Sequence, residues 1–255
     1  LRTQARRYVD EIASKFDMDI ARVLDVILRL VWARIYDGLE VSEEDMERVR
    51  EATRQGSVVL VPSHKSHIDY LVMSQVLLHH NLMPPRVAAG ANLSFFPLGP
   101  ILRRGGAFFL RRSFKGLELY ARVFRAYMWR LLKEGFTLEF FIEGGRSRTG
   151  KTLPPKLGLL NLVVRAWIDG QGRGEARDTI FLPASISYDK IIETDAYTRE
   201  LEGGEKEKES AGALLKVGGV LRSKYGRVFV TFDEPISLRD FAARHSAREG
   251  VAFEE

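Results

Sequence analysis

The strongest constraint on the fold of this chain is a change in hydrophobic pattern near residue 57. From there on, short apolar runs rich in β-branched residues alternate with segments of helical period. Ser57–Pro62 (SVVLVP) is apolar almost throughout rather than at every second position, which is typical of a strand buried on both faces. The alternation predicts an α/β domain with a mixed, largely buried β-sheet flanked by helices.

The same patterns predict the individual elements of this domain. Further strands are expected at residues 86–91, 137–142, 179–187 and 227–232. Helices are expected at residues 70–80, 115–133 and 157–168, and Ser237 is expected to cap a closing helix. Residues 200–210, rich in Glu and Lys, are expected to form a solvated loop or helix.

Residues 1–55 are patterned differently and are predicted to form a small N-terminal helical region. Apolar residues recur at three-to-four spacing within Ile20–Ile35, and Ser42 opens a capping sequence for a further helix. The chain begins with Leu rather than Met. We therefore expect a piece of a longer protein, in which a helical region (1–55) precedes the α/β domain (56–255).

The chain has a formal net charge of +5, and one segment supplies the whole basic excess. Residues 86–156 hold 14 Lys and Arg against 4 Asp and Glu, whereas the remainder holds 25 against 30. Such a field attracts phosphate groups of a nucleic acid, an anionic membrane surface or a phosphorylated substrate. The absence of Cys excludes disulfides, a thiolate nucleophile and Cys-ligated metal, and no run reaches the roughly 18 apolar residues of a membrane-spanning helix.

The first candidate site follows the buried strand, in Pro62-Ser-His-Lys-Ser-His-Ile-Asp-Tyr70. His64 and Asp69 are the residue types of a general base and its orienting carboxylate. On a regular helix their side chains would lie about 140° apart, so His64 is expected in the turn and Asp69 in the first turns of the next helix. The alternative has equal weight: His64 is an ordinary loop residue, and Asp69 is an acidic residue in the first turn of a helix, with no joint function. A metal site that adds His67 is disfavoured, because no further ligand cluster accompanies it.

Two further segments have the composition of phosphate-binding loops. A short apolar run ends in Arg111 and Arg112, and paired guanidinium groups bind phosphate in a bidentate way; an exposed basic turn is the alternative. The second segment, Phe140–Lys151, runs from a strand into a glycine-rich loop that lacks the spacing of a P-loop or a dinucleotide fingerprint. Its candidate binding residues are Glu143, Gly144, Gly145, Arg146, Ser147 and Arg148.

A fourth segment, Phe181–Tyr188, is apolar and contains Pro183. Proline has no N–H to donate to a strand ladder, which favours an edge strand or a bulge. A core strand without any ligand contact is at least as well supported by the pattern.

These four segments, in this order, resemble the sequence blocks of the glycerolipid acyltransferase family. The amino acids within and beside these blocks resemble still more closely those of the bacterial membrane-bound glycerol-3-phosphate acyltransferases (the PlsB type). The segments that carry this are Val61–Leu71, Ala88–Leu93, Gly106–Arg112, Phe114–Gly116, Ile142–Gly150 and Lys206–Ser210. Ser63 departs from the wider family, which usually has Asn there, and full-length members are much longer than this chain.

The resemblance implies transfer of a long-chain acyl group from acyl-CoA or acyl-acyl carrier protein to the sn-1 hydroxyl of glycerol 3-phosphate, giving lysophosphatidate. His64 would be the general base and Asp69 its orienting partner, with no acyl-enzyme, no metal and no cofactor. The remaining residues would bind substrate: Arg111, Arg112, Arg146 and Arg148 the phosphate, with Ser147 beside them, Glu143, Gly144 and Gly145 the polyol, and Pro183 the acyl-donor side.

The resemblance also implies an anionic phospholipid surface as a partner, with a peripheral or monotopic protein on the cytoplasmic face of the bacterial inner membrane. The apolar segment Leu93–Leu102, followed by Arg103 and Arg104, has the composition for insertion at the headgroup boundary; a buried loop is the alternative. Competing functions are acyl transfer to dihydroxyacetone phosphate or lysophosphatidate, and a non-catalytic lipid- or phosphate-binding module. No nucleic acid is expected, because the aromatic residues of the basic segment are patterned as buried strand residues.

Overall fold

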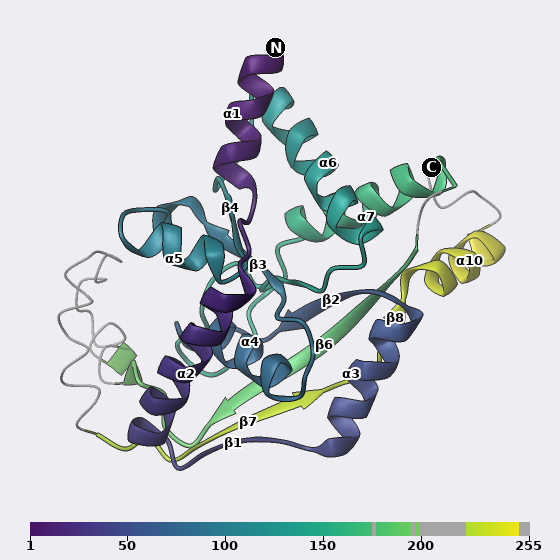
Figure 1. Ribbon diagram of the computed structural model, residues 1–255. Helices are drawn as coiled ribbons and strands as arrows, with labels where there is room; N and C mark the ends of the chain where they lie inside the picture. The colour runs from purple at the N-terminus through teal and green to yellow at the C-terminus, as the bar shows by residue number, and fades with distance from the viewer. Residues whose placement is uncertain (175–176, 195–196, 199–222, 250–255) are drawn as a thin grey trace.

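The fold is a mixed β-sheet covered by helices on both faces, seen here in a computed structural model of the chain (Figure 1). The structure describes residues 1–174, 177–194, 197–198 and 223–249, so residues 200–210 lie outside the described residues. The strands follow the order β1-β7-β6-β2-β5-β3-β4, and β8 pairs with β6. The predicted fold class is confirmed.

The sheet is parallel around its centre and antiparallel toward one side. Pairs β2–β6, β2–β5, β3–β5, β3–β4 and β1–β7 are parallel, whereas β6–β7 and β6–β8 are antiparallel. The strands are β1 (Gly38–Val41), β2 (Gly56–Pro62), β3 (Arg86–Gly90), β4 (Ala107–Leu110), β5 (Leu138–Glu139), β6 (Asp178–Tyr188), β7 (Arg227–Phe232) and β8 (Ile236–Ser237).

Two hydrophobic cores lie on opposite faces of this sheet. Side chains from α2, α3 and α4 pack against one face, and side chains from α1, α6, α7 and α10 pack against the other. The helices are α1 (Arg2–Ile12), α2 (Met18–Ile35), α3 (Glu43–Gln55), α4 (Asp69–His79), the 3-10 helix η1 (Ala91–Leu93), α5 (Leu98–Arg104), α6 (Glu118–Lys133), α7 (Gly158–Gln171) and α10 (Leu238–Glu249).

β2 lies at the centre of both cores because it is apolar on both sides. Val58 and Leu60 belong to the core under α4, whereas Val59 between them belongs to the core under α6 and α7. Burial on both faces explains why its sequence is apolar throughout, as parallel strands require. Its carboxyl end therefore has a fixed position, and the candidate site begins there.

The predicted helices and strands are present, with two local corrections. The region predicted to be entirely helical up to residue 55 contains the strand Gly38–Val41, which pairs with β7. This strand has only four residues and two apolar side chains, too few for a periodicity signal. The strand predicted at 137–142 pairs only at Leu138–Glu139, because the Phe141 carbonyl already accepts a turn hydrogen bond from the Gly144 N–H.

Pro183 lies inside the sheet, so the edge strand predicted for it is wrong. β6 is bordered by β2 on one side, where Pro183 is in register with Val61. On its other side, β8 pairs up to Phe181 and β7 begins at Ala184. Pro183 falls in the gap between these two partners, where no ladder donor is needed.

The helix caps follow the sequence. The Ser42 side chain accepts a hydrogen bond from the Asp45 N–H at the start of α3, and the Ser237 hydroxyl accepts one from the Asp240 N–H at the start of α10. Within the described residues, no helix is both long enough and apolar enough to cross a bilayer.

The two-sided burial of β2 predicts a large cost for shortening its core side chains. Leu60 is fully buried, so Leu60→Ala should lower the free energy of unfolding by about 2–5 kcal/mol. Leu30 on α2 is 70% exposed, and Leu30→Ala, the matched control, should change it by less than about 0.5 kcal/mol. Urea unfolding followed by circular dichroism measures both; equal effects would contradict the assignment of the core.

Candidate active site

The candidate active site lies where β2 ends and α4 begins. His64 is in the turn after β2, and Asp69 is the first residue of α4. His64 Nδ1 and Asp69 Oδ2 are 2.9 Å apart, which is a hydrogen bond. This is the arrangement that the spacing predicts, because a continuous helix would have held the two side chains on different faces.

The Asp69 carboxylate is fully buried, and four donors surround it. Its Oδ2 accepts hydrogen bonds from His64 Nδ1 and from the backbone N–H groups of Lys65 and Ser66, at 2.7 and 2.9 Å for the latter two. Its Oδ1 accepts a hydrogen bond from the Tyr188 hydroxyl. A buried carboxylate with this many donors is stabilised in its charged form, which an isolated one would not be.

Tyr188 comes from the end of β6, so the site joins two neighbouring strands. Burial and the nearby Asp69 charge both raise the pKa of the Tyr188 phenol far above its ordinary value. The phenol is therefore neutral at physiological pH and acts only as a hydrogen-bond donor to the carboxylate. Asp69 is held in one orientation as a result, because both of its oxygens are occupied.

The His64 ring is fixed from a second direction by Phe141. The two rings are stacked, with centroids 3.9 Å apart and an interplanar angle of 21°. The His64 side chain is 15% exposed. Because Nδ1 donates to a carboxylate, the neutral ring carries its proton there and leaves the Nε2 lone pair available as a base.

The glycine-rich loop after β5 is attached to the turn that holds His64. Glu143 is buried, and its carboxylate accepts hydrogen bonds from the backbone N–H groups of His64 and Leu153, at 3.1 and 2.8 Å. The backbone N–H of Ser147 donates to the His64 carbonyl at 2.7 Å, and its hydroxyl donates to the Lys151 carbonyl. Glu143 and Ser147 therefore connect two loops.

Arg146, one of the arginines predicted to bind phosphate, is linked to the His64 turn through Tyr197 and Glu193. Its guanidinium donates to the Tyr197 hydroxyl at 2.9 Å and lies 3.9 Å from a Glu193 oxygen. The Tyr197 hydroxyl in turn donates to the Lys65 carbonyl, and Glu193 accepts hydrogen bonds from Ser66. Burial, with a smaller effect of the Glu193 charge, raises the pKa of Tyr197 to about 12.

Arg111 and Arg112 are not brought to this turn. They follow β4, which is separated from β2 by β5 and β3, roughly 14 Å at the usual strand spacing. The Arg111 guanidinium makes a bidentate ion pair with Glu11 of α1, at 2.6 and 2.7 Å, and Arg112 is exposed.

The remaining predicted residues lie in the glycine-rich loop. Gly144 has a positive φ of 60°, and a Cβ there would meet the Lys156 side chain at 2.8 Å, so this position favours glycine on both counts. A Cβ at Gly145 would contact nothing, so the packing does not demand glycine there. Arg148 is half-buried in the same loop.

Comparison with known proteins gives the relationship of this chain. The sequence profile of the Acyltransferase family matches residues 40–187, and that of the "Glycerol-3-phosphate acyltransferase C-terminal region" matches residues 197–252. The first match covers more than half of the chain, and it includes His64, Asp69 and Arg146. This chain belongs to the acyltransferase family.

Curated relatives named "Glycerol-3-phosphate acyltransferase" are similar to almost the whole chain. The protein of Pseudomonas paraeruginosa is 46% identical over 94% of this chain, and that of Pasteurella multocida is 44% identical over 95%. The protein of Aeromonas hydrophila is 44% identical over 99%. The chain spans 28%, 29% and 31% of these three relatives, so it corresponds to less than a third of each.

A solved structure has the same fold. It is the 1-acyl-sn-glycerophosphate (LPA) acyltransferase PlsC from Thermotoga maritima, with a TM-score of 0.50 and 18% sequence identity. The match covers 91% of this chain and 73% of that one. At this identity the likeness concerns the acyltransferase fold alone.

Glu139 is a second carboxyl group close to Asp69, and sequence patterns missed it. It is fully buried in β5, in register with Leu60, on the sheet face that α4 covers. Neither of its carboxyl oxygens has a hydrogen-bond partner within the described part of the chain. Burial, with a smaller contribution from the Asp69 charge, raises the pKa of Glu139 well above its ordinary value. Burial therefore favours the protonated form of the Glu139 carboxyl group.

Three other residues of this site were also missed, for different reasons. Tyr188 ends the fourth sequence block, and a polar residue at the end of a buried strand is a signal that could have identified it. Glu193 and Tyr197 have no such signal, because they reach the site only through tertiary folding of the segment after β6.

The raised pKa of Glu139 predicts a pH-dependent cost to stability. Glu139 takes up a proton on folding, so stability falls as the pH rises above its ordinary pKa of 4.5, by about 1.4 kcal/mol per pH unit until the folded pKa is reached. Glu139→Gln removes this proton uptake. The free energy of unfolding of the variant, relative to the parent chain, should therefore increase as the pH rises above the ordinary pKa of 4.5.

Urea unfolding at several pH values measures this difference. Glu118→Gln changes an exposed carboxylate on α6 in the same way and serves as the control, with no expected pH trend. A parallel response of parent chain and Glu139→Gln to pH would mean that Glu139 is ionised in the folded chain.

Proposed function

We propose that this chain carries the acyl-transfer site of a PlsB-type glycerol-3-phosphate acyltransferase. The hydrogen bond between His64 and Asp69 is the single observation on which the proposal rests most heavily. It gives a family member an oriented imidazole with a free Nε2 at the carboxyl edge of the sheet. The names of the relatives supply the acceptor, glycerol 3-phosphate.

In the proposed reaction, His64 Nε2 takes the proton of the sn-1 hydroxyl of glycerol 3-phosphate as its oxygen attacks the thioester carbonyl carbon of acyl-CoA or acyl-acyl carrier protein. Collapse of the tetrahedral intermediate breaks the carbon–sulfur bond, and the imidazolium returns the proton to the leaving thiolate. The products are lysophosphatidate and the free thiol. Asp69 stays ionised and stabilises the imidazolium, as in other His–Asp pairs.

The proposal gives each arginine a place relative to the acceptor phosphate. Arg146 and Arg148 belong to the loop that Ser147 attaches to the His64 turn, which favours them as the nearer phosphate ligands. Arg111 has to exchange its Glu11 partner before it binds a phosphate, and Arg112 is exposed at the same strand end. Glu143 and Gly144 act by shaping the loop around the polyol.

The same chemistry suits dihydroxyacetone phosphate or lysophosphatidate as acceptor. Relatives named for glycerol 3-phosphate favour that acceptor, and rates with the three acceptors and a long-chain thioester distinguish them directly.

The membrane part of the proposal has support on α2 and the segment before α5. Exposed apolar side chains lie on α2 (Val23 55%, Val26 49%, Ile27 50%, Leu30 70%), just before α5 (Phe96 85%) and on α5 (Ile101 43%), and α2 contacts α5. Arg22, Arg29 and Arg104 lie among them in the sequence. Apolar side chains beside arginines favour binding at the headgroup region of an anionic bilayer, on the cytoplasmic face of the inner membrane.

Removing the base tests the catalytic proposal. His64→Ala should lower kcat for acyl transfer by about 10²–10⁴-fold, because no other group takes the hydroxyl proton, and should leave donor binding unchanged. His79→Ala, an exposed histidine at the far end of α4, is the matched control and should retain full activity. Steady-state assays with glycerol 3-phosphate and palmitoyl-CoA measure both. Loss of less than half the activity in His64→Ala would refute the mechanism.

Polar substitutions on α2 and before α5 test the membrane proposal. Leu30→Ser combined with Phe96→Ser should weaken sedimentation with phosphatidylglycerol vesicles by about ten-fold or more, since each change removes an exposed apolar group. Ile236→Ser, at an equally apolar exposed position on β8, is the control. Unchanged sedimentation of the double variant would refute this surface as the membrane contact.

A further inference from the structure

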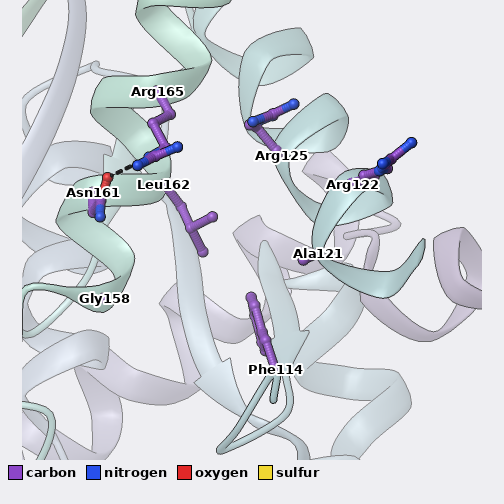
Figure 2. Close-up of a pocket in the computed structure, with 8 residues that line it drawn as sticks. All are labelled: Phe114, Ala121, Arg122, Arg125, Gly158, Asn161, Leu162 and Arg165. Carbon is purple, nitrogen blue, oxygen red and sulfur yellow. Dashed lines mark hydrogen bonds between the residues drawn. The ribbon is translucent and has the colours of Figure 1, made fainter. Parts of the chain in front are cut away.

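A groove lies between α6 and α7, apart from the His64 turn. Its volume is about 370 Å³. Phe114, Ala121 and Leu162 give it an apolar floor, and Figure 2 shows Phe114 and Leu162 in the space between the two helices. The other residues that line it are Arg122, Arg125, Gly158, Asn161 and Arg165.

The rim of this groove has an unbalanced positive charge. Arg125 forms an ion pair with Asp169 at 3.0 Å, so its charge is offset. Arg165 donates to the neutral side-chain oxygen of Asn161 at 2.9 Å, and within the described residues Arg122 has no acidic partner. Two guanidinium charges, one on each helix, are therefore left without a carboxylate on either side of an apolar floor (Figure 2).

The groove opens at the same edge of the sheet as His64. Phe114 follows the carboxyl end of β4, and Gly158 begins α7 directly after the loop of Glu143, where the Lys156 N–H donates to the Ile142 carbonyl at 2.7 Å. β4 and β2 are three strand spacings apart, roughly 14 Å. A ligand held in the groove therefore needs an extended arm to reach the imidazole.

The position of the groove favours a water-soluble ligand over a lipid headgroup. α6 and α7 cover one face of the sheet, whereas α2, with its exposed apolar side chains, covers the other. A lipid bound at the surface of α2 is thus separated from the groove by the sheet. A ligand with a flat apolar group, phosphates and a long flexible arm matches the floor, the rim and the distance.

We propose that this groove binds the nucleotide end of a coenzyme A thioester, with the adenine against Phe114 and Leu162 and the phosphates on Arg122 and Arg165. The pantetheine arm then runs along the carboxyl edge of the sheet and presents the thioester to His64. The inference rests on the proposed function for the identity of the donor. It adds a site for that donor, on helices outside the four sequence blocks.

Direct binding tests this without requiring turnover. Isothermal titration of the chain with CoA and with dephospho-CoA, which lacks the 3′-phosphate, should give at least ten-fold tighter binding of CoA. Arg122→Ala combined with Arg165→Ala should weaken CoA binding at least ten-fold and abolish the preference between the two ligands. Arg130→Ala removes a charge from the same helix outside the groove and should change the Kd less than two-fold.

The outcomes separate the groove from the catalytic proposal. His64→Ala should bind CoA normally, so lost turnover with retained binding concerns the base and not the groove. Absence of CoA binding, equal Kd values for CoA and dephospho-CoA, or an equal effect of Arg130→Ala would overturn the assignment. The assignment would also be overturned if the double variant bound CoA as the parent chain does but no longer bound acyl carrier protein or phosphatidylglycerol vesicles. The groove would then serve an acidic protein or a lipid. Arg122→Lys keeps the positive charge and should retain most of the affinity for CoA. This variant shows whether weaker CoA binding comes from the lost charge or from a folding defect.

Discussion

The buried charge of Asp69 is the interaction on which the site depends. A carboxylate in a dry environment is costly unless donors surround it, and here the donors come from two places in the chain. The turn after β2 supplies His64 and two backbone N–H groups, and the end of β6 supplies Tyr188. The carboxylate therefore fixes the turn, the start of α4 and the end of β6 relative to one another, and the imidazole is oriented by the same requirement.

Burial raises the pKa of Glu139, and the Asp69 charge adds a smaller effect in the same direction. Two carboxylates in one buried region repel each other, and only one of them here has donors. Asp69 has four hydrogen-bond donors around its carboxylate, whereas burial favours the protonated form of Glu139.

The sequence was sufficient for the elements that local physics determines and insufficient where tertiary contacts decide. Ser57–Pro62 was identified because burial on both faces leaves a continuous apolar run, and the turn position of His64 followed from helix geometry alone. Gly38–Val41 was missed because its stability comes from pairing with β7, nearly two hundred residues later. Pro183 was placed at an edge because no local pattern reveals a gap between two successive strand partners.

The arginines show the same limit in the candidate site. Composition identified the basic segment, but the partner of each guanidinium depends on the fold: Arg111 binds Glu11 of α1, Arg146 lies between Tyr197 and Glu193, and Arg125 pairs with Asp169. Much of the basic excess is thus neutralised by acids from elsewhere in the chain. Within the described residues, Arg122 of α6 and Arg165 of α7 have no acidic partner. The proposed function thus places both anionic substrates at the carboxyl edge of the sheet, whereas the exposed apolar side chains of α2 lie on the face that α6 and α7 do not cover.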